Sequence, residues 1–181
     1  ARQISMANSD VALANDVFSL FSNPAGLAQL NWREVGVYYS PAPFGLTELS
    51  NGYVTYHEPF SFGSLALGGM TYGFDLYRES KVLLGYSYNY DNIFFAGVAL
   101  NYHNYSIKNY GSTGVFYFNL GGLVYILDEL RWGFLVSNIN KASVANFDDQ
   151  IPMVLSTGFS FDILENFSLN FALEKDIRYN P

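Results

Sequence analysis

The sequence predicts an all-β fold, a transmembrane antiparallel β-barrel preceded by a short N-terminal plug segment. The first observation behind this prediction is an alternation of apolar and polar residues along short segments. Between Lys81 and Tyr90, one set of alternate positions is apolar or aromatic and the other contains Lys, Gly, Ser and Asn; the first set is Val82, Leu84, Tyr86, Tyr88 and Tyr90. A period of two residues indicates a β-strand with two unlike faces, and this pair of faces is typical of strands that separate lipid from a polar lumen.

The second observation is the composition. Half of the 181 residues are hydrophobic, 18% are aromatic and only 14% are charged, whereas charged residues usually make up about a quarter of a soluble domain. The apolar residues occur in short pieces, and no run approaches the roughly 18 residues that a membrane-spanning helix requires. A soluble all-β protein is the less favoured alternative, because its outward strand faces would carry Lys, Glu and Thr.

Charge and cysteine content exclude several classes of function. The net charge is −7 and cysteine is absent, so there is no disulfide framework and no cysteine metal site. Nucleic acid is not an expected partner, because phosphate binding needs a basic surface. The chain begins at Ala1-Arg2-Gln3 without an initiator Met, which we interpret as a mature or trimmed product. From the predicted barrel we expect the protein in the bacterial outer membrane.

Residues 1–31 differ from the rest of the chain because they lack strict alternation. Asp16 is placed to cap a short helix that runs through Phe21. The motif Asn23-Pro24-Ala25-Gly26 is then expected to break this helix. The segment is too short and too polar to span a bilayer, so we expect it to lie on the membrane surface or to fold into the mouth of a barrel as a plug.

Residues 32–181 are predicted to form the barrel strands, nine in number. The predicted strands are 33–40, 49–58, 64–74, 80–90, 93–103, 115–125, 131–138, 152–162 and 167–174. The even-numbered connections are short, and Asp91-Asn92 is a two-residue hairpin turn. The odd-numbered connections 41–48, 104–114 and 139–151 are longer, while 75–79 is short. Outer-membrane barrels have short periplasmic turns and longer outer loops, so we expect the even connections and the N-terminal segment on the periplasmic side.

An odd number of strands leaves one edge unpaired, and an open edge is not viable in hydrocarbon. We therefore expect the barrel to be incomplete in this sequence, closed either by further strands or by another chain.

Catalysis is the less favoured interpretation of the polar residues. His103, Ser156, Ser160 and Asp162 share the lumen face and would permit a Ser-His-Asp set, but nothing marks one serine as a nucleophile. The other histidine, His57, lies beside Glu58-Pro59 and is expected at the membrane interface. Two distant histidines do not make a metal site, so we expect no catalytic, metal or cofactor residues. The mid-strand glycines, such as Gly68-Gly69 and Gly121-Gly122, are expected to permit bends or the close approach of a plug. Most of the tyrosines and both tryptophans are expected to form an aromatic girdle at the lipid headgroups.

Several motifs resemble those of the FadL-like outer-membrane protein superfamily, and most closely its PorV/PorQ branch from bacteria with type IX secretion. The motifs are Ala1-Arg2-Gln3-Ile4-Ser5-Met6-Ala7, Val11-Ala12-Leu13-Ala14-Asn15-Asp16, Asn23-Pro24-Ala25-Gly26, Gly133–Asn140, Ile151-Pro152 and Leu169–Asp176. The resemblance covers the whole chain, and it implies a fourteen-stranded barrel with an N-terminal plug, of which nine strands are present here.

The resemblance implies an accessory protein that binds secreted cargo or a secretion complex at the cell surface. The alternatives are a FadL-type passive transporter of hydrophobic small molecules and a structural subunit of a larger membrane complex. The expected partners are the lipid bilayer, a protein at the outer loops and, for the transporter alternative, a hydrophobic ligand. The candidate partner contacts are aromatic or apolar residues that we assign to the outer loops: Phe44, Leu46, Tyr105, Ile107 and Tyr110.

Overall fold

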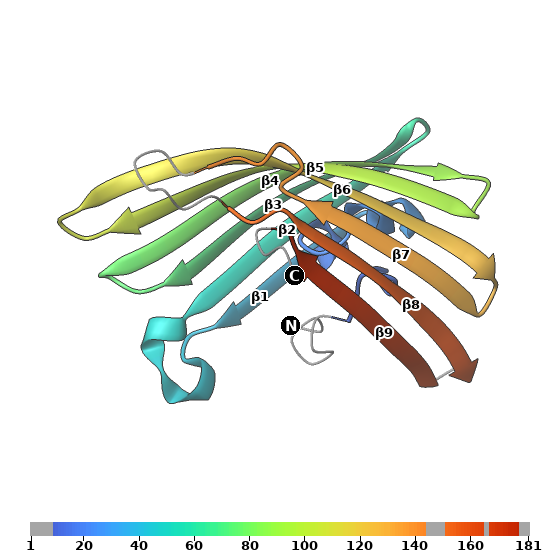
Figure 1. Cartoon of the computed structure of the whole chain (residues 1–181), viewed down its shortest axis with the longest axis horizontal. Coiled ribbons are helices and arrows are strands. Elements are labelled where there is room, and N and C mark those ends of the chain that lie inside the picture. Colours follow the sequence, from blue (N-terminus) through green and yellow to red (C-terminus); the bar gives the residue numbers. More distant parts are fainter. Residues whose placement is uncertain (1–8, 144–150, 165–166, 178–181) are drawn as a thin grey trace.

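The chain folds into one antiparallel sheet of nine strands, as a computed structural model of residues 9–143, 151–164 and 167–177 shows (Figure 1). The strands are β1 (Glu34–Ser40), β2 (Asn51–Phe60), β3 (Gly63–Gly73), β4 (Tyr77–Tyr90), β5 (Phe94–Ile107), β6 (Gly111–Leu127), β7 (Leu130–Ser137), β8 (Val154–Leu164) and β9 (Phe167–Asp176). Each strand pairs with the next one along the chain. The predicted all-β class and all nine strands are therefore confirmed, with ends that differ by a few residues.

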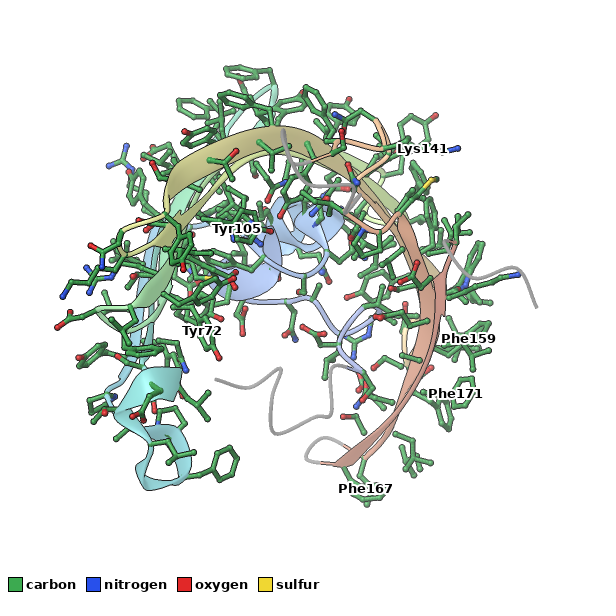
Figure 2. The ribbon with its side chains drawn as sticks, turned by 60° about the vertical axis from the view of Figure 1, so that its left-hand side comes forward. Tyr72, Tyr105, Lys141, Phe159, Phe167 and Phe171 are labelled. Carbon is green, nitrogen blue, oxygen red and sulfur yellow. The ribbon has the colours of Figure 1, made fainter. Side chains whose placement is uncertain are left out.

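The sheet curves into an open arch, with β1 and β9 as its two edges (Figures 1 and 2). The two faces of this arch differ as the alternation predicts. Phe159, Phe167 and Phe171 point away from the concave side, whereas Tyr72 and Tyr105 point into it (Figure 2). On the convex face, large apolar side chains are exposed on every strand, for example Val37 at 72% and Phe171 at 58%. The strand pairings place only three charged side chains on this face, Glu58, Arg78 and Lys175, and each lies near a strand end.

Because consecutive strands are antiparallel, the connections after β2, β4, β6 and β8 lie at one end of the sheet, which we call the even-numbered end, and those after β1, β3, β5 and β7 lie at the other, the odd-numbered end. The connections described at the even-numbered end are short. Residues 61–62 join β2 to β3, 91–93 join β4 to β5 and 128–129 join β6 to β7. The turn after β4 has three residues rather than the predicted two, because Tyr90 pairs with Phe94. Asp91 and Asn92 both have positive φ, 55° and 57°, the conformation expected of these residues in a tight hairpin turn. The even-numbered connections that the structure describes are therefore short, as predicted.

The odd-numbered connections agree with the prediction except for one. The connections 41–50 and 138–153 are long and 74–76 is short, as predicted, but 108–110 is short as well. The predicted loop 104–114 is wrong, because β5 and β6 continue through most of it as a hairpin that pairs Ile107 with Gly111. Tyr105 and Ile107 therefore lie in a strand, and Tyr105 faces the concave side (Figure 2).

The N-terminal segment forms two short 3₁₀ helices, η1 (Val17–Leu20) and η2 (Pro24–Gln29), and two more, η3 (Pro43–Gly45) and η4 (Thr47–Leu49), lie in the connection after β1. Asp16 caps η1 as predicted, through a hydrogen bond from the Phe18 amide to its carboxylate. The motif Asn23-Pro24-Ala25-Gly26 does more than end this helix: Asn23 caps η2, and Pro24 occupies its first turn, where the missing N–H costs nothing. In the described part of the chain, no helix is both long and apolar enough to cross a bilayer.

Candidate functional site

The N-terminal segment lies across the concave face of the sheet (Figure 1). It contacts the sheet, whose concave side we call the wall, at a row of glycines that face inward, one on each of seven strands. We call this row the glycine belt. Its members are Gly36, Gly68, Gly85, Gly97, Gly121, Gly133 and Gly158. A Cβ placed on Gly97 would lie 2.4 Å from the carbonyl carbon of Pro24 and from the nitrogen of Ala25. The belt therefore lets the segment approach the wall more closely than any side chain would allow.

Two hydrophobic clusters join the segment to the wall. The larger contains four residues from the segment, Val17, Leu20, Leu27 and Leu30, and three from the strands, Ala66, Leu83 and Ala99. The smaller joins Ala25 and Ala28 to Phe95 and Leu123. Among the described residues, the segment thus supplies about half of the apolar core on the concave side, and burial of these side chains holds it in place.

Asn23 fixes the middle of the segment. Its side chain is fully buried, and its amide nitrogen donates to the carbonyl oxygens of Val11 at 2.7 Å, Gly122 at 3.2 Å and Phe134 at 3.4 Å. Its amide oxygen accepts from the Ala25 amide at 3.2 Å. Because Gly122 and Phe134 are register partners on β6 and β7, this one side chain ties the segment to both strands.

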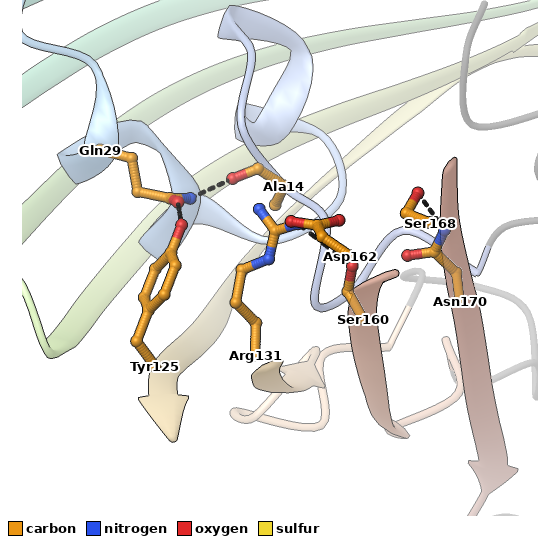
Figure 3. A network of polar contacts seen from close by, with 8 residues as sticks. All are labelled: Ala14, Gln29, Tyr125, Arg131, Ser160, Asp162, Ser168 and Asn170. Atoms are coloured by element: carbon orange, nitrogen blue, oxygen red, sulfur yellow. Dashed lines mark hydrogen bonds and ion pairs between the residues drawn. The ribbon is translucent and has the colours of Figure 1, made fainter. Parts of the chain in front are cut away.

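A second polar network lies near the even-numbered end (Figure 3). Arg131 is buried; its guanidinium donates to the Asp162 carboxylate at 2.6 Å and to the Ser160 hydroxyl at 3.3 Å. It also lies over the ring of Tyr125, whose hydroxyl donates to Gln29 of the N-terminal segment at 2.6 Å. The network therefore links three strands to the end of η2.

A third cluster occupies the concave face toward the odd-numbered end. The carboxylate of Glu79 accepts from the Tyr77 hydroxyl at 2.7 Å and lies 3.0 Å from Nε2 of His103. Nδ1 of His103 lies 3.0 Å from the Tyr105 hydroxyl. Lys81, next to His103 in register, lies over the ring of Tyr117. The result is a hydrogen-bonded chain along β4 and β5 with a cation beside it.

The residues considered for catalysis have separate partners. His103 contacts Glu79 and Tyr105, Ser160 and Asp162 contact Arg131, and Ser156 donates to Glu174. The described residues contain no group of three or more potential metal ligands.

Several residues expected at the membrane interface lie on the concave side instead, among them His57 and Tyr53. His57 is fully buried on the concave side, where its Nδ1 lies 3.0 Å from the Trp32 carbonyl oxygen. Tyr53, which we expected in the aromatic girdle, faces the concave side and packs edge-to-face on Phe21.

The candidate partner contacts lie toward the odd-numbered end of the sheet, and most of them are exposed. Phe44 is 96% exposed and Tyr110 is 89% exposed, while Leu46 and Ile107 are also exposed. Phe44 has a φ of 56°, a left-handed conformation that is unfavourable for a bulky residue. Tyr105 is the exception, because its side chain belongs to the concave cluster around His103.

Sequence reasoning identified Gly68-Gly69 and Gly121-Gly122 as places for a bend or for a plug to approach. Gly68 and Gly121 lie against the N-terminal segment, whereas Gly69 and Gly122 face Val54 and Phe134. Sequence reasoning missed Arg131 and Glu79, and it assigned Glu79 to the connection 75–79. Had the alternation been continued through both residues, it would have placed a charge on the polar face at each position.

The fold and the site together define an all-β protein whose curved antiparallel sheet carries its own N-terminal segment on the concave face. A scan against protein-family models finds no match to this chain, and a search of curated proteins finds none either.

Proposed function

We propose that this chain is part of an outer-membrane β-barrel and that it acts as an accessory protein of the PorV/PorQ type. In this role it binds secreted cargo, or a secretion or surface complex, through the connections at the odd-numbered end. The N-terminal segment acts as a plug on the periplasmic side of the lumen.

The convex face supports the membrane part of the proposal. Outward apolar residues on β4 run from Val82 to Tyr90, nine positions by number, which is about the 9 to 11 residues that a tilted strand needs to cross a bilayer. The same face carries large apolar residues along the middle of the other strands, and Glu58, Arg78 and Lys175 lie at its margins. Soluble proteins rarely expose a contiguous apolar surface of this extent.

The exposed residues of the 41–50 and 108–110 connections support the binding part, and Phe44 is the single observation that carries it. A strained backbone costs about 1 to 3 kcal/mol and is found mostly at functional sites. Here the left-handed conformation of Phe44 holds an aromatic ring almost wholly in solvent, next to exposed Leu46. Such an arrangement gains nothing for the isolated chain, and it suits a ring that inserts into a partner.

The transporter alternative predicts a different dependence on sequence. In a transporter, changes in the lumen block the uptake of hydrophobic molecules, and changes at Phe44 have little effect. The glycine belt and the buried Asn23 favour a segment that stays seated, so we rank the transporter second and a purely structural subunit third.

The test is a pull-down of surface or secreted proteins with the protein refolded in detergent. Phe44→Gly combined with Leu46→Ser should abolish the capture of partner proteins and leave the barrel folded, because glycine adopts the left-handed conformation without strain. The matched control is Phe62→Ser, which removes an exposed ring from the even-numbered end and should leave capture unchanged. Equal capture by both variants would refute the docking role of these connections.

A further inference from the structure

Strand β6 extends well beyond its neighbour β7. The pairing of β6 with β7 begins at Leu120 and Val136, and β6 itself begins at Gly111. In the described residues, the stretch of β6 before Leu120 pairs with a strand on one side only, namely with β5. The chain after β7 leaves the sheet at Asn138. The first part of β6, from Gly111 to Asn119, therefore has an edge on the side away from β5 that no described strand occupies.

The lower part of this edge is covered by a side chain that imitates a strand. The carboxamide of Asn140 accepts from the Phe118 amide at 3.0 Å and donates to the Phe116 carbonyl oxygen at 3.2 Å. The Ile139 amide donates to the Phe118 carbonyl oxygen at 3.0 Å. These are the kinds of hydrogen bond that a neighbouring strand makes, and they show that the main-chain groups of Phe116 and Phe118 face away from β5.

The same alternation continues in the part of β6 that precedes Phe116, beyond the reach of Asn140. In an antiparallel pair, residues whose main-chain groups point to one side recur at every second position, so Ser112 and Gly114 present their N–H and C=O groups on the same side as Phe116. Proteins usually protect a free edge with lysine, proline or a bulge. The stretch Gly111–Phe116 reads Gly-Ser-Thr-Gly-Val-Phe and contains no charged residue and no proline.

We propose that the edge of β6 from Ser112 to Phe116 is a docking site at which an extended peptide segment of a partner protein is added as a further strand. The alternating donors and acceptors of this edge match an extended main chain, and Asn140 limits the added strand to about four or five residues. Exposed Tyr110 and Phe116 flank the edge and give the added strand an apolar contact. The inference rests on the proposed function, since it names the kind of partner segment and its place at the odd-numbered end.

Amide hydrogen exchange of the refolded protein in detergent tests whether the edge is open. The Ser112 and Gly114 amides should exchange at least about tenfold faster than the Thr113 and Val115 amides, because only the latter two face β5. Protection of Ser112 and Gly114 at all protein concentrations would mean that the protein covers this edge itself. Protection that disappears on dilution would mean that a second copy covers it. Either result would overturn the proposal.

Binding of a strand-forming probe tests the docking. The probe is an eight-residue peptide of alternating Thr and Val with a fluorophore at one end, and its control is the same peptide N-methylated at alternate residues. Ser112→Pro removes an edge N–H without removing a hydrogen bond to β5, and edge strands tolerate proline. It should weaken binding about tenfold, whereas Ser112→Ala should bind as the unchanged protein does. No binding of the probe, equal binding by Ser112→Pro, or equal binding of the methylated peptide would overturn the proposal.

The two proposals fail separately. Loss of probe binding together with intact capture of partners through Phe44 would remove the β6 site alone. Probe binding together with capture that is insensitive to Phe44 would remove the docking role of the 41–50 connection alone.

Discussion

Gly97→Ala tests how the N-terminal segment is seated. The added Cβ would lie 2.4 Å from main-chain atoms of Pro24 and Ala25, and main-chain atoms cannot rotate away as the end of a side chain can. Overpacking of this kind costs about 1 to 3 kcal/mol, and the gain from replacing a strand glycine by alanine returns about 0.5 to 1 kcal/mol. We therefore expect a net loss of about 1 to 2 kcal/mol in the free energy of unfolding, close to a tenfold change in the folding constant.

The control is Gly69→Ala. Gly69 follows the belt residue Gly68 on β3 and faces the convex side. A Cβ there would be 3.5 Å from the nearest atom, Cγ1 of Val54, which is an ordinary van der Waals contact. This variant should be neutral or slightly more stable than the unchanged protein.

The assay is a urea titration of the protein refolded into detergent micelles, followed by tryptophan fluorescence, with limited proteolysis of residues 9–31 in parallel. Gly97→Ala should lower the midpoint and also expose the N-terminal segment to protease, whereas Gly69→Ala should do neither. Equal midpoints and equal protease sensitivity for the two variants would refute the idea that the belt glycines seat the segment.

Two further predictions concern the convex face and the buried ion pair. If the convex face contacts lipid, Phe171→Arg should destabilise the protein in a bilayer by about 2 to 4 kcal/mol for a position near the midplane, while Ser168→Arg on the concave side should cost much less; equal costs in a lipid refolding titration would contradict the assignment of faces. Asp162→Asn should leave the buried Arg131 guanidinium without a counter-charge and cost about 2 kcal/mol, less than the 3 to 5 kcal/mol of a fully buried pair because Asp162 is partly exposed; an unchanged urea midpoint would mean that the guanidinium finds another partner.

The strands could be predicted from the sequence because one face of each is apolar and the other is not. The prediction failed between residues 104 and 114 for a physical reason. There the outward positions are Asn104, Ser106, Ser112 and Gly114, which are polar or small. The inward positions are of mixed polarity, namely Tyr105, Ile107, Gly111 and Thr113. Because neither face is uniformly apolar, the sequence shows no alternation with a period of two. This hairpin therefore could not be distinguished from a loop by its sequence.

The contacts of the site could be predicted only in part. Asn23-Pro24-Ala25-Gly26 is conspicuous as a motif, but its role depends on the distant strands it touches. Arg131 and Asp162 are 31 residues apart, and their pairing follows from the register of β7 against β8. That register is a property of the assembled sheet, which a pattern within a single strand does not specify.

The long reach of Asn23 has a consequence for the order of assembly. Its partners on β6 and β7 lie 99 and 111 positions further along the chain, so the site that receives it does not exist until those two strands have paired. Contacts between such distant residues carry the entropy of closing a very large loop and form late. The N-terminal segment, which is synthesised before β6 and β7, is therefore among the last parts to reach its place, and its apolar residues need protection until then. Asn23 can form both of these hydrogen bonds only when β6 and β7 are paired in the correct register, so its burial depends on that pairing.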